Sequence, residues 1–450
     1  MAKGKIVLIL LVLLIVFAVG WSMIGCAPFS QCPWEQDETE TEPKKVSLTF
    51  VGARDDIGYW KEIIAAFNKY EIKKRNLNVS VKYEQLNEYT YEDILLDKML
   101  NQEAPNIFLA FNTWIQKYQN RIVAAPKDIM TVDEFEGIFA PVTSDDLIID
   151  GEIYSFPLYV DTLALYYNKD MFLNAGYITT PKTWQEFTNY VEKLTILNER
   201  GGVDRLGATI GGGEMVNRSS DVVMLMVMQN NSQLHSDELA SFSTTAAMTA
   251  VKFYTDFANP NNRFYTWNPE DQQYSIDYFT QGKAAMSINY SYEIKNIENK
   301  TGGALNYGIA TVPQQYTGDK LNYASYWAPV VAKGARCTKE DGVSVSCESL
   351  AWEFIYFVAQ AENVELYLEK SNRPAANLNI AKKQSDNSSS QMAPFASQVF
   401  TAKSWANSNN EYNDEILMGM IDSIISKDAE EKKDIIVAIE DAKNQIRELN

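Results

Sequence analysis

The feature that most constrains this fold is an alternation of strand-like and helix-like segments in the first quarter of the chain. Residues 46–51, 79–83 and 106–111 are rich in β-branched and aromatic side chains, which is typical of strands. Between them, residues 60–67 and 91–99 repeat apolar side chains at the spacing of one helix face. A βαβαβ order predicts an α/β protein with a mostly parallel sheet flanked by helices.

The loops after these strands are the first places to expect a binding site. In sheets of this kind, ligands bind outside the carboxyl ends of the strands. The sequence therefore draws attention to the loops at residues 52–58 and 112–118.

Later segments predict further regular structure. Asp150-Gly151 joins two short apolar runs and is typical of a hairpin turn. Thr183 and Glu186 have capping-box spacing at the start of an amphipathic helix. Apolar periodicity predicts further helices at residues 247–254, 350–358 and 435–449.

The first 25 residues read as an export signal or a membrane anchor. Two lysines precede an uncharged apolar run over residues 6–24, which is followed by Gly25-Cys26. Two interpretations remain open: cleavage before Cys26 with lipid attached to its thiol, or an uncleaved anchor. Both place the rest of the chain outside the cytoplasm, tethered to the membrane by an acidic flexible segment at 26–45.

The cysteines fit an oxidising compartment. Cys337 and Cys347 bracket a short polar loop, and we expect them to form a disulfide. Lipid on Cys26 would leave Cys32 unpaired, whereas a Cys26–Cys32 bridge would contradict lipidation. No histidine or third cysteine lies near the loop, so we expect no metal there.

Charge and composition exclude several classes of function. A net charge of -19 argues against a nucleic-acid partner, since phosphate contacts need clustered lysine and arginine. The single histidine, His235, stands in a polar stretch, so no histidine-based catalytic site is expected. The glycines before Glu214 lack phosphate-loop spacing and suit a turn or a binding loop, with Glu214 as a candidate contact. We expect no cofactor and no catalytic residues.

Aromatic side chains are abundant, and several stand in turn-like contexts. Sugar rings pack their C–H faces on aromatic rings, and their hydroxyl groups need polar partners. A structural role in the core remains the alternative for each ring. The candidates are Tyr59, Trp114, Tyr159, Trp267, Tyr290, Tyr292, Tyr326 and Trp327.

Several blocks of sequence resemble one known family. Residues 151–176 and 181–184 are similar to the extracellular solute-binding proteins of carbohydrate ABC importers, the group that includes maltodextrin-binding protein. Residues 279–292 and 323–331, the latter leading into 351–357, strengthen the resemblance because the blocks keep their order and spacing.

The resemblance implies a two-lobe fold that closes around a ligand by hinge motion. By analogy, the first lobe holds residues 46–156 and 305–349, and the second holds 157–304 and 350–450. It also implies ligand contacts at strand ends and at the hinge, from Arg54, Asp55, Asn112, Trp114, Tyr159, Asp161, Tyr290, Tyr292, Tyr326 and Trp327. For Asp161, a hinge hydrogen bond is the alternative role.

The expected function is therefore capture of a sugar or oligosaccharide by a monomer that delivers it to the permease subunits of an ABC transporter. Two alternatives stay open. The same scaffold could bind a polyol, a phosphate ester or an amino acid derivative, or the chain could be a surface glycosidase, which needs a fixed pair of carboxylates.

Overall fold

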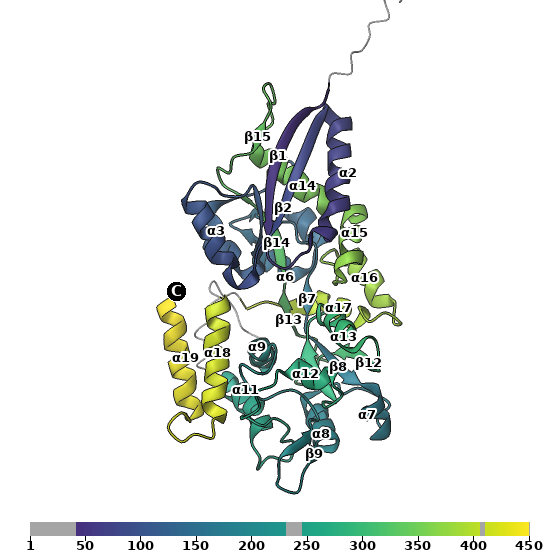
Figure 1. The fold of residues 1–450 in the computed structure, drawn as a ribbon, viewed down its shortest axis with the longest axis vertical. Helices are drawn as coiled ribbons and strands as arrows, with labels where there is room; N and C mark the ends of the chain where they lie inside the picture. The colour runs from purple at the N-terminus through teal and green to yellow at the C-terminus, as the bar shows by residue number, and fades with distance from the viewer. Residues whose placement is uncertain (1–41, 231–244, 406–409, 450) are drawn as a thin grey trace, which may run out of the picture.

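The computed structural model describes residues 42–230, 245–405 and 410–449 (Figure 1). The expected signal segment, most of the tether, Cys26, Cys32 and His235 lie outside the described residues. Within the described ranges, no helix is both long and apolar enough to cross a membrane.

The first lobe is built on the predicted βαβαβ unit. β1 pairs in parallel with β2 and with β3, and β14 runs antiparallel between β3 and β4. β15 adds an antiparallel edge to β1. The strands are β1 (Lys44–Gly52), β2 (Leu77–Gln85), β3 (Ile107–Phe111), β4 (Ile122–Val123), β14 (Trp327–Ala332) and β15 (Thr338–Lys339).

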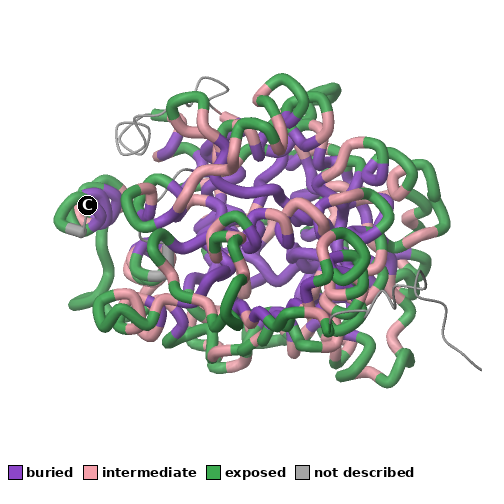
Figure 2. Tube along the Cα trace, turned by 90° about the horizontal axis from the view of Figure 1, so that it is seen from above, coloured by how far each residue is buried: buried purple, intermediate pink, exposed green. Residues whose placement is uncertain are grey.

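Helices cover this sheet because each turns an apolar face toward it. The Phe50 ring on β1 lies 4.7 Å from Trp60 and 6.1 Å from Phe354, which come from two different helices. The buried apolar residues of the sheet and of these helices form one cluster. In Figure 2, buried positions gather in the interior of the molecule and exposed ones around its outside. The helices of this lobe are α2 (Ile57–Arg75), α3 (Tyr91–Leu100), α4 (Ile115–Tyr118), α5 (Val132–Ile138), α6 (Pro141–Leu147), α14 (Cys347–Ala359), α15 (Ala361–Ser371) and α16 (Leu378–Asp386).

The second lobe has a smaller sheet, which is antiparallel rather than parallel. β8 (Ala164–Asn168) lies between β11 (Met286–Asn289) and β12 (Tyr307–Thr311) and runs antiparallel to both. Its surrounding helices are α7 (Lys169–Asn174), α8 (Trp184–Leu194), α9 (Ser219–Asn230), α11 (Thr245–Thr255), α12 (Ser275–Thr280), α13 (Glu293–Thr301), α18 (Asn410–Ile425) and α19 (Ile435–Leu449).

Short strands connect the lobes. β13 (Asn322–Ser325) pairs with β7 (Asp161–Thr162) on one side and with β16 (Ala402–Lys403) on the other. β7 and β13 lie at the waist between the lobes in Figure 1. α17 (Ala393–Gln398) lies beside them there and precedes β16 in the chain. The chain therefore crosses between the lobes more than once, as the resemblance implied.

The packing corrects the expected lobe boundaries in two places. β12 lies within 305–349, which was expected in the first lobe, yet it pairs along its length with β8 of the second. Helices α14 to α16 were expected in the second lobe, yet their apolar side chains belong to the first core. The reason is long-range burial: Phe354 lies 5.2 Å from Phe67 of α2.

The local predictions are confirmed with one variation. Asp150 and Gly151 have φ angles of 53° and 74°, as a tight hairpin between β5 (Ile148–Ile149) and β6 (Glu152–Ile153) requires. Thr183 caps α8 by accepting from the Glu186 amide, but the Glu186 carboxylate accepts from Lys182 N instead of closing the box. The Cys337–Cys347 disulfide is present.

Candidate ligand-binding cleft

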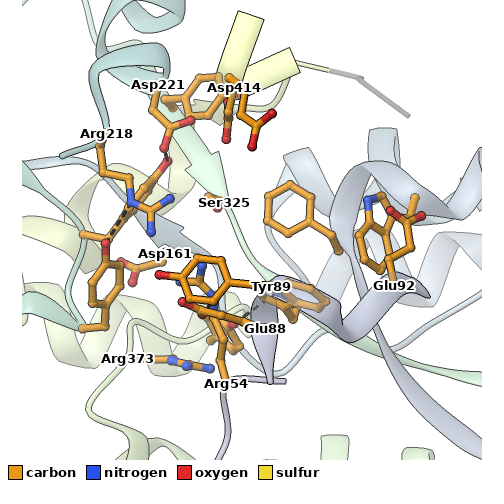
Figure 3. Close-up of a pocket in the computed structure, with 18 of the residues that line it drawn as sticks. Arg54, Glu88, Tyr89, Glu92, Asp161, Arg218, Asp221, Ser325, Arg373 and Asp414 are labelled. Carbon is orange, nitrogen blue, oxygen red and sulfur yellow. Dashed lines mark hydrogen bonds and ion pairs between the residues drawn. The ribbon is translucent and has the colours of Figure 1, made fainter. Parts of the chain in front are cut away.

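A cavity of ≈ 310 Å³ lies between the lobes (Figure 3). This volume is at the lower end of the ~300–1,000 Å³ range of small-molecule sites. Its lining residues come from both cores and from the waist: Arg54, Glu88, Tyr89, Glu92, Phe111, Trp114, Tyr159, Asp161, Arg218, Asp221, Tyr290, Tyr292, Tyr323, Ser325, Trp327, Arg373, Asp414, Glu415 and Met418.

The first lobe contributes a cluster of three rings. Phe111 ends β3 and pairs with Trp327 at the start of β14, so their rings lie 5.4 Å apart on the same face of the sheet. Trp114 follows in the short 3-10 helix η2 (Asn112–Trp114), with its ring 5.2 Å from Trp327. These rings supply an apolar wall at the carboxyl end of β3, where the sequence predicted a binding loop.

The second lobe contributes two tyrosines held by an arginine. Tyr290 and Tyr292 follow β11, with ring centres 6.2 Å apart. The Arg218 Nε donates to the Tyr292 hydroxyl at 2.8 Å, and the guanidinium lies 5.7 Å and 5.4 Å from the two ring centres. The Tyr290 hydroxyl donates to Asp221 Oδ2 at 2.9 Å. These contacts fix both rings before a ligand arrives.

The waist contributes Tyr159, Asp161 and Arg373. The Asp161 carboxylate accepts from Ser291 N at 3.1 Å, from Ser291 Oγ at 2.7 Å and from Thr162 N at 2.9 Å. Burial raises the pKa of Asp161 to about 6, while the bonds from Ser291 work in the opposite direction. Asp161 therefore makes the hinge hydrogen bond that was its alternative role, and it also lines the cavity.

Arg373 is a buried cation beside this carboxylate. Its guanidinium lies 4.2 Å from the Tyr159 ring centre, and its Nη1 donates to Asp55 Oδ1 at 3.0 Å. The ion pair with Asp55 holds the guanidinium in place at the waist and balances its charge.

The structure brings together seven of the residues expected from sequence, and their contact with a ligand stays a prediction. They are Arg54, Trp114, Tyr159, Asp161, Tyr290, Tyr292 and Trp327.

Asp55 lies behind the cavity instead of facing it. It is 1% exposed and accepts from Arg373 and from the Tyr367 hydroxyl at 2.8 Å. Adjacent residues in this loop point in opposite directions, so Arg54 reaches the cavity while Asp55 faces inward. Asp55 holds Arg373 and so acts on the cavity through it.

Asn112 and Tyr326 also face away from the cavity. The Asn112 amide and the Tyr326 hydroxyl donate to Asp146 Oδ2 at 2.9 Å and 2.7 Å. Burial raises the pKa of Asp146 to about 6, against the hydrogen bonds from Ser404 and Tyr326. Tyr326 and Trp327 point to opposite sides, as successive extended residues do.

Three further candidates, Trp267, Glu214 and Tyr59, do not line the cavity. Trp267 is 1% exposed in the core of the second lobe. The Gly213 and Glu214 backbone amides donate to the two Asp422 carboxylate oxygens. This glycine loop therefore packs against α18 and does not line the cavity. Tyr59 lies in the first turn of α2, with its ring 6.2 Å from Tyr367 of α15 and 5.8 Å from the Lys295 ammonium.

Some residues that line the cavity were not among those predicted from the sequence. They come from the loop after β2 in the first lobe and from α18 in the second. Glu88 and Tyr89 follow β2, so the strand-end rule that flagged the other two loops would have found them. Asp414, Glu415 and Met418 come from α18. No local sequence motif predicts that these residues line the cavity. Among the described residues, no group of histidine, cysteine, aspartate or glutamate could hold a metal ion.

Known proteins resemble this chain across most of its length. The family model for bacterial extracellular solute-binding proteins matches residues 54–365. A binding protein of Brucella abortus is 25% identical over 281 residues, covering 60% of this chain and 63% of its own length, so the chain spans less than two thirds of that relative. Maltodextrin-binding protein MdxE of Bacillus subtilis is 26% identical over 326 residues, covering 69% of this chain and 70% of that protein.

A solved structure agrees on the fold. The sugar-binding protein MalE of Xanthomonas citri superposes with a TM-score of 0.71 at 16% identity, covering 90% of this chain and 97% of that one. The two lobes and the cavity between them agree with the family match, and the extracellular family places the chain outside the cytoplasm. This protein belongs to the bacterial extracellular solute-binding proteins.

Proposed function

We propose that this protein captures a sugar or oligosaccharide in the cavity between its lobes and delivers it to the permease subunits of an ABC importer. The observation that carries the proposal is the pairing of aromatic walls with hydrogen-bonding groups in one cavity. Phe111, Trp114 and Trp327 face it from one lobe, and Tyr290 and Tyr292 face it from the other. Rings bind the C–H faces of a sugar, and the polar groups bind its hydroxyls.

The relatives support the same ligand class. MdxE is a maltodextrin-binding protein by name, and MalE of Xanthomonas citri is a sugar-binding protein. Membership in a family of binding proteins supports delivery to a transporter and capture without turnover.

A phosphate ester fits the cavity less well. The lining holds six carboxylates and three arginines. Arg54 is paired with Glu88 at 2.9 Å, and Arg373 is paired with Asp55. A doubly charged phosphate would therefore meet excess negative charge with two of its three candidate cations already neutralised.

The test is a thermal-shift screen against neutral mono- and oligosaccharides, followed by calorimetric titration of whichever sugar stabilises the protein. A ligand at 100 times its dissociation constant adds about 2.7 kcal/mol of stability. Trp327→Ala removes one wall, and we expect it to weaken binding roughly 30- to 1,000-fold, by analogy with buried aromatic hot spots.

Tyr326→Phe is the matched control, because its hydroxyl contacts Asp146 outside the cavity. We expect this variant to bind like the wild type. Equal binding by Trp327→Ala and the wild type contradicts the cavity assignment, and consumption of sugar during titration contradicts binding without turnover.

We also propose that the mature protein is a monomer tethered by lipid on Cys26. The Gly25-Cys26 junction after the apolar run supports the lipid. Mass spectrometry of the mature N-terminus decides between lipid and uncleaved anchor, since an intact N-terminal segment rules out lipidation. Light scattering of the soluble part measures the oligomeric state.

A further inference from the structure

The charges that line the cavity are unevenly distributed. Arg54 and Arg373 lie at one end of the view in Figure 3, whereas Asp221 and Asp414 lie close together at the other, on α9 and α18. Glu415 of α18 lines the cavity as well. The end formed by α9 and α18 therefore gathers three carboxylates.

The Arg218 guanidinium faces these carboxylates, and its charge works against the burial that raises the pKa of Asp221 and of Asp414; the charge of Arg54 does so to a smaller extent. Arg218 lies over the rings of Tyr290 and Tyr292 and donates to the Tyr292 hydroxyl. Among the described residues, no lysine or arginine lies within 4.0 Å of the Asp221 or Asp414 carboxylate oxygens. This end of the cavity keeps a negative charge that the protein itself does not fully neutralise.

Both carboxylates are desolvated, and Asp221 is also held in place by a hydrogen bond. Asp221 is 8% exposed and accepts from the Tyr290 hydroxyl, which orients its carboxylate within the cavity. Burial raises the pKa of Asp414 to about 7, and repulsion from Asp221 adds to this effect. A bound cation would relieve both costs, whereas a neutral hydroxyl would relieve them less.

The surrounding rings favour a cation as well. An ammonium group is attracted to the faces of tyrosine and tryptophan, and aromatic walls with a carboxylate are a common way to bind amines. Tyr290, Tyr292 and Tyr323 line the cavity with Asp221 and Asp414, and the Arg218 guanidinium over the first two rings shows that this wall accommodates a cation.

We propose that the ligand is a sugar carrying a protonated amino group, which Asp221 and Asp414 bind at the end of the cavity formed by α9 and α18. This inference rests on the proposed sugar-binding function. It adds that the amino group distinguishes the preferred ligand from the corresponding neutral sugar.

The experiment compares sugars that differ at a single substituent. Calorimetric titrations at neutral pH use D-glucose against D-glucosamine, and cellobiose against the dimer of β-1,4-linked glucosamine. One charge-assisted contact corresponds to roughly 10- to 100-fold in affinity, so we expect the amine of at least one pair to bind tighter by that factor. Choline, a quaternary ammonium ion, is titrated alongside as a cation without a sugar ring.

Variants test whether Asp221 and Asp414 are the residues that bind the amino group. Asp221→Asn and Asp414→Asn should each reduce the preference for the amine about tenfold, while Asp414→Glu, which keeps the charge, should retain it. Glu270→Gln removes a charge that pairs with Lys427 outside the cavity, and it should leave the preference unchanged. Melting temperatures confirm that each variant is folded.

The outcomes separate this inference from the function on which it rests. If neutral sugars bind as tightly as their amines, the amino-sugar inference is overturned and sugar binding stands. If neither member of any pair binds, both are overturned. Binding of choline as tight as that of the amino sugar overturns the requirement for a ring.

Discussion

Arg373 and Asp55, which are 318 residues apart in sequence, form a buried ion pair of 3.0 Å at the waist of the molecule. Their side chains are 9% and 2% exposed. The pair joins the loop after β1 to the segment that follows α15, so it ties the first strand-end loop to the hinge.

Asp55→Ala leaves the Arg373 guanidinium buried without its counter-ion. Removing one partner of such a pair costs about 3–5 kcal/mol, so we expect a loss of that size in the free energy of unfolding. Urea denaturation measures it. Glu88→Gln breaks the exposed Arg54–Glu88 pair and should cost about 0–1 kcal/mol. Equal losses for the two variants would contradict the structural role assigned to Asp55.

Gly213→Ala should disturb the packing of α18 against the glycine loop at residues 211–213. A Cβ at this position would lie 2.3 Å from the Met418 carbonyl oxygen and 2.6 Å from the Asp422 carboxylate, so the helix must move. Overpacking of this kind costs about 1–3 kcal/mol, and because Met418 lines the cavity, ligand affinity should fall too.

Gly419→Ala is its control on α18 itself. A Cβ there meets nothing within 4 Å, and alanine favours a helix interior by about 0.5–1 kcal/mol over glycine. This variant should be as stable as the wild type or more so. If Gly419→Ala is destabilised and Gly213→Ala is as stable as the wild type, the packing of α18 described here is contradicted.

Asp414→Asn should change how stability depends on pH. The folded pKa of Asp414 is raised from 3.8 to about 7, so between these values the folded protein holds a proton that the unfolded chain has released. That contribution is fully present below pH ~4 and is lost as the pH rises through ~7. Relative to Asp414→Asn, the wild type should lose stability over this window. Denaturation curves at several pH values that run parallel for both proteins would contradict the prediction.

Removing the Cys337–Cys347 disulfide should destabilise the first lobe without affecting the cavity. Its cysteines are 10 residues apart, and closing a loop of that length is worth roughly 3 kcal/mol at most. The measurement is the unfolding midpoint with and without reductant. The double Cys337→Ser, Cys347→Ser variant is the control, since any remaining reductant effect comes from Cys26 and Cys32.

Local sequence determined the elements that organise the first lobe. Strand and helix periodicities are set by neighbouring residues, so β1 to β3, α2 and α3 could be predicted, and with them the strand-end loops that carry Arg54 and Trp114. The hairpin at Asp150-Gly151 and the cap at Thr183 follow from the same local chemistry.

Tertiary structure decided which of these side chains face the cavity. Tyr326 and Trp327 are equally plausible in sequence, but the pairing of β14 with β3 turns Trp327 toward Phe111 and leaves Tyr326 to Asp146. Contacts between distant segments decide that α14 to α16 belong to the first lobe. They also bring Asp414 close to Asp221. Such contacts arise from burial of apolar faces, which fixes which elements pack together only when the whole chain folds.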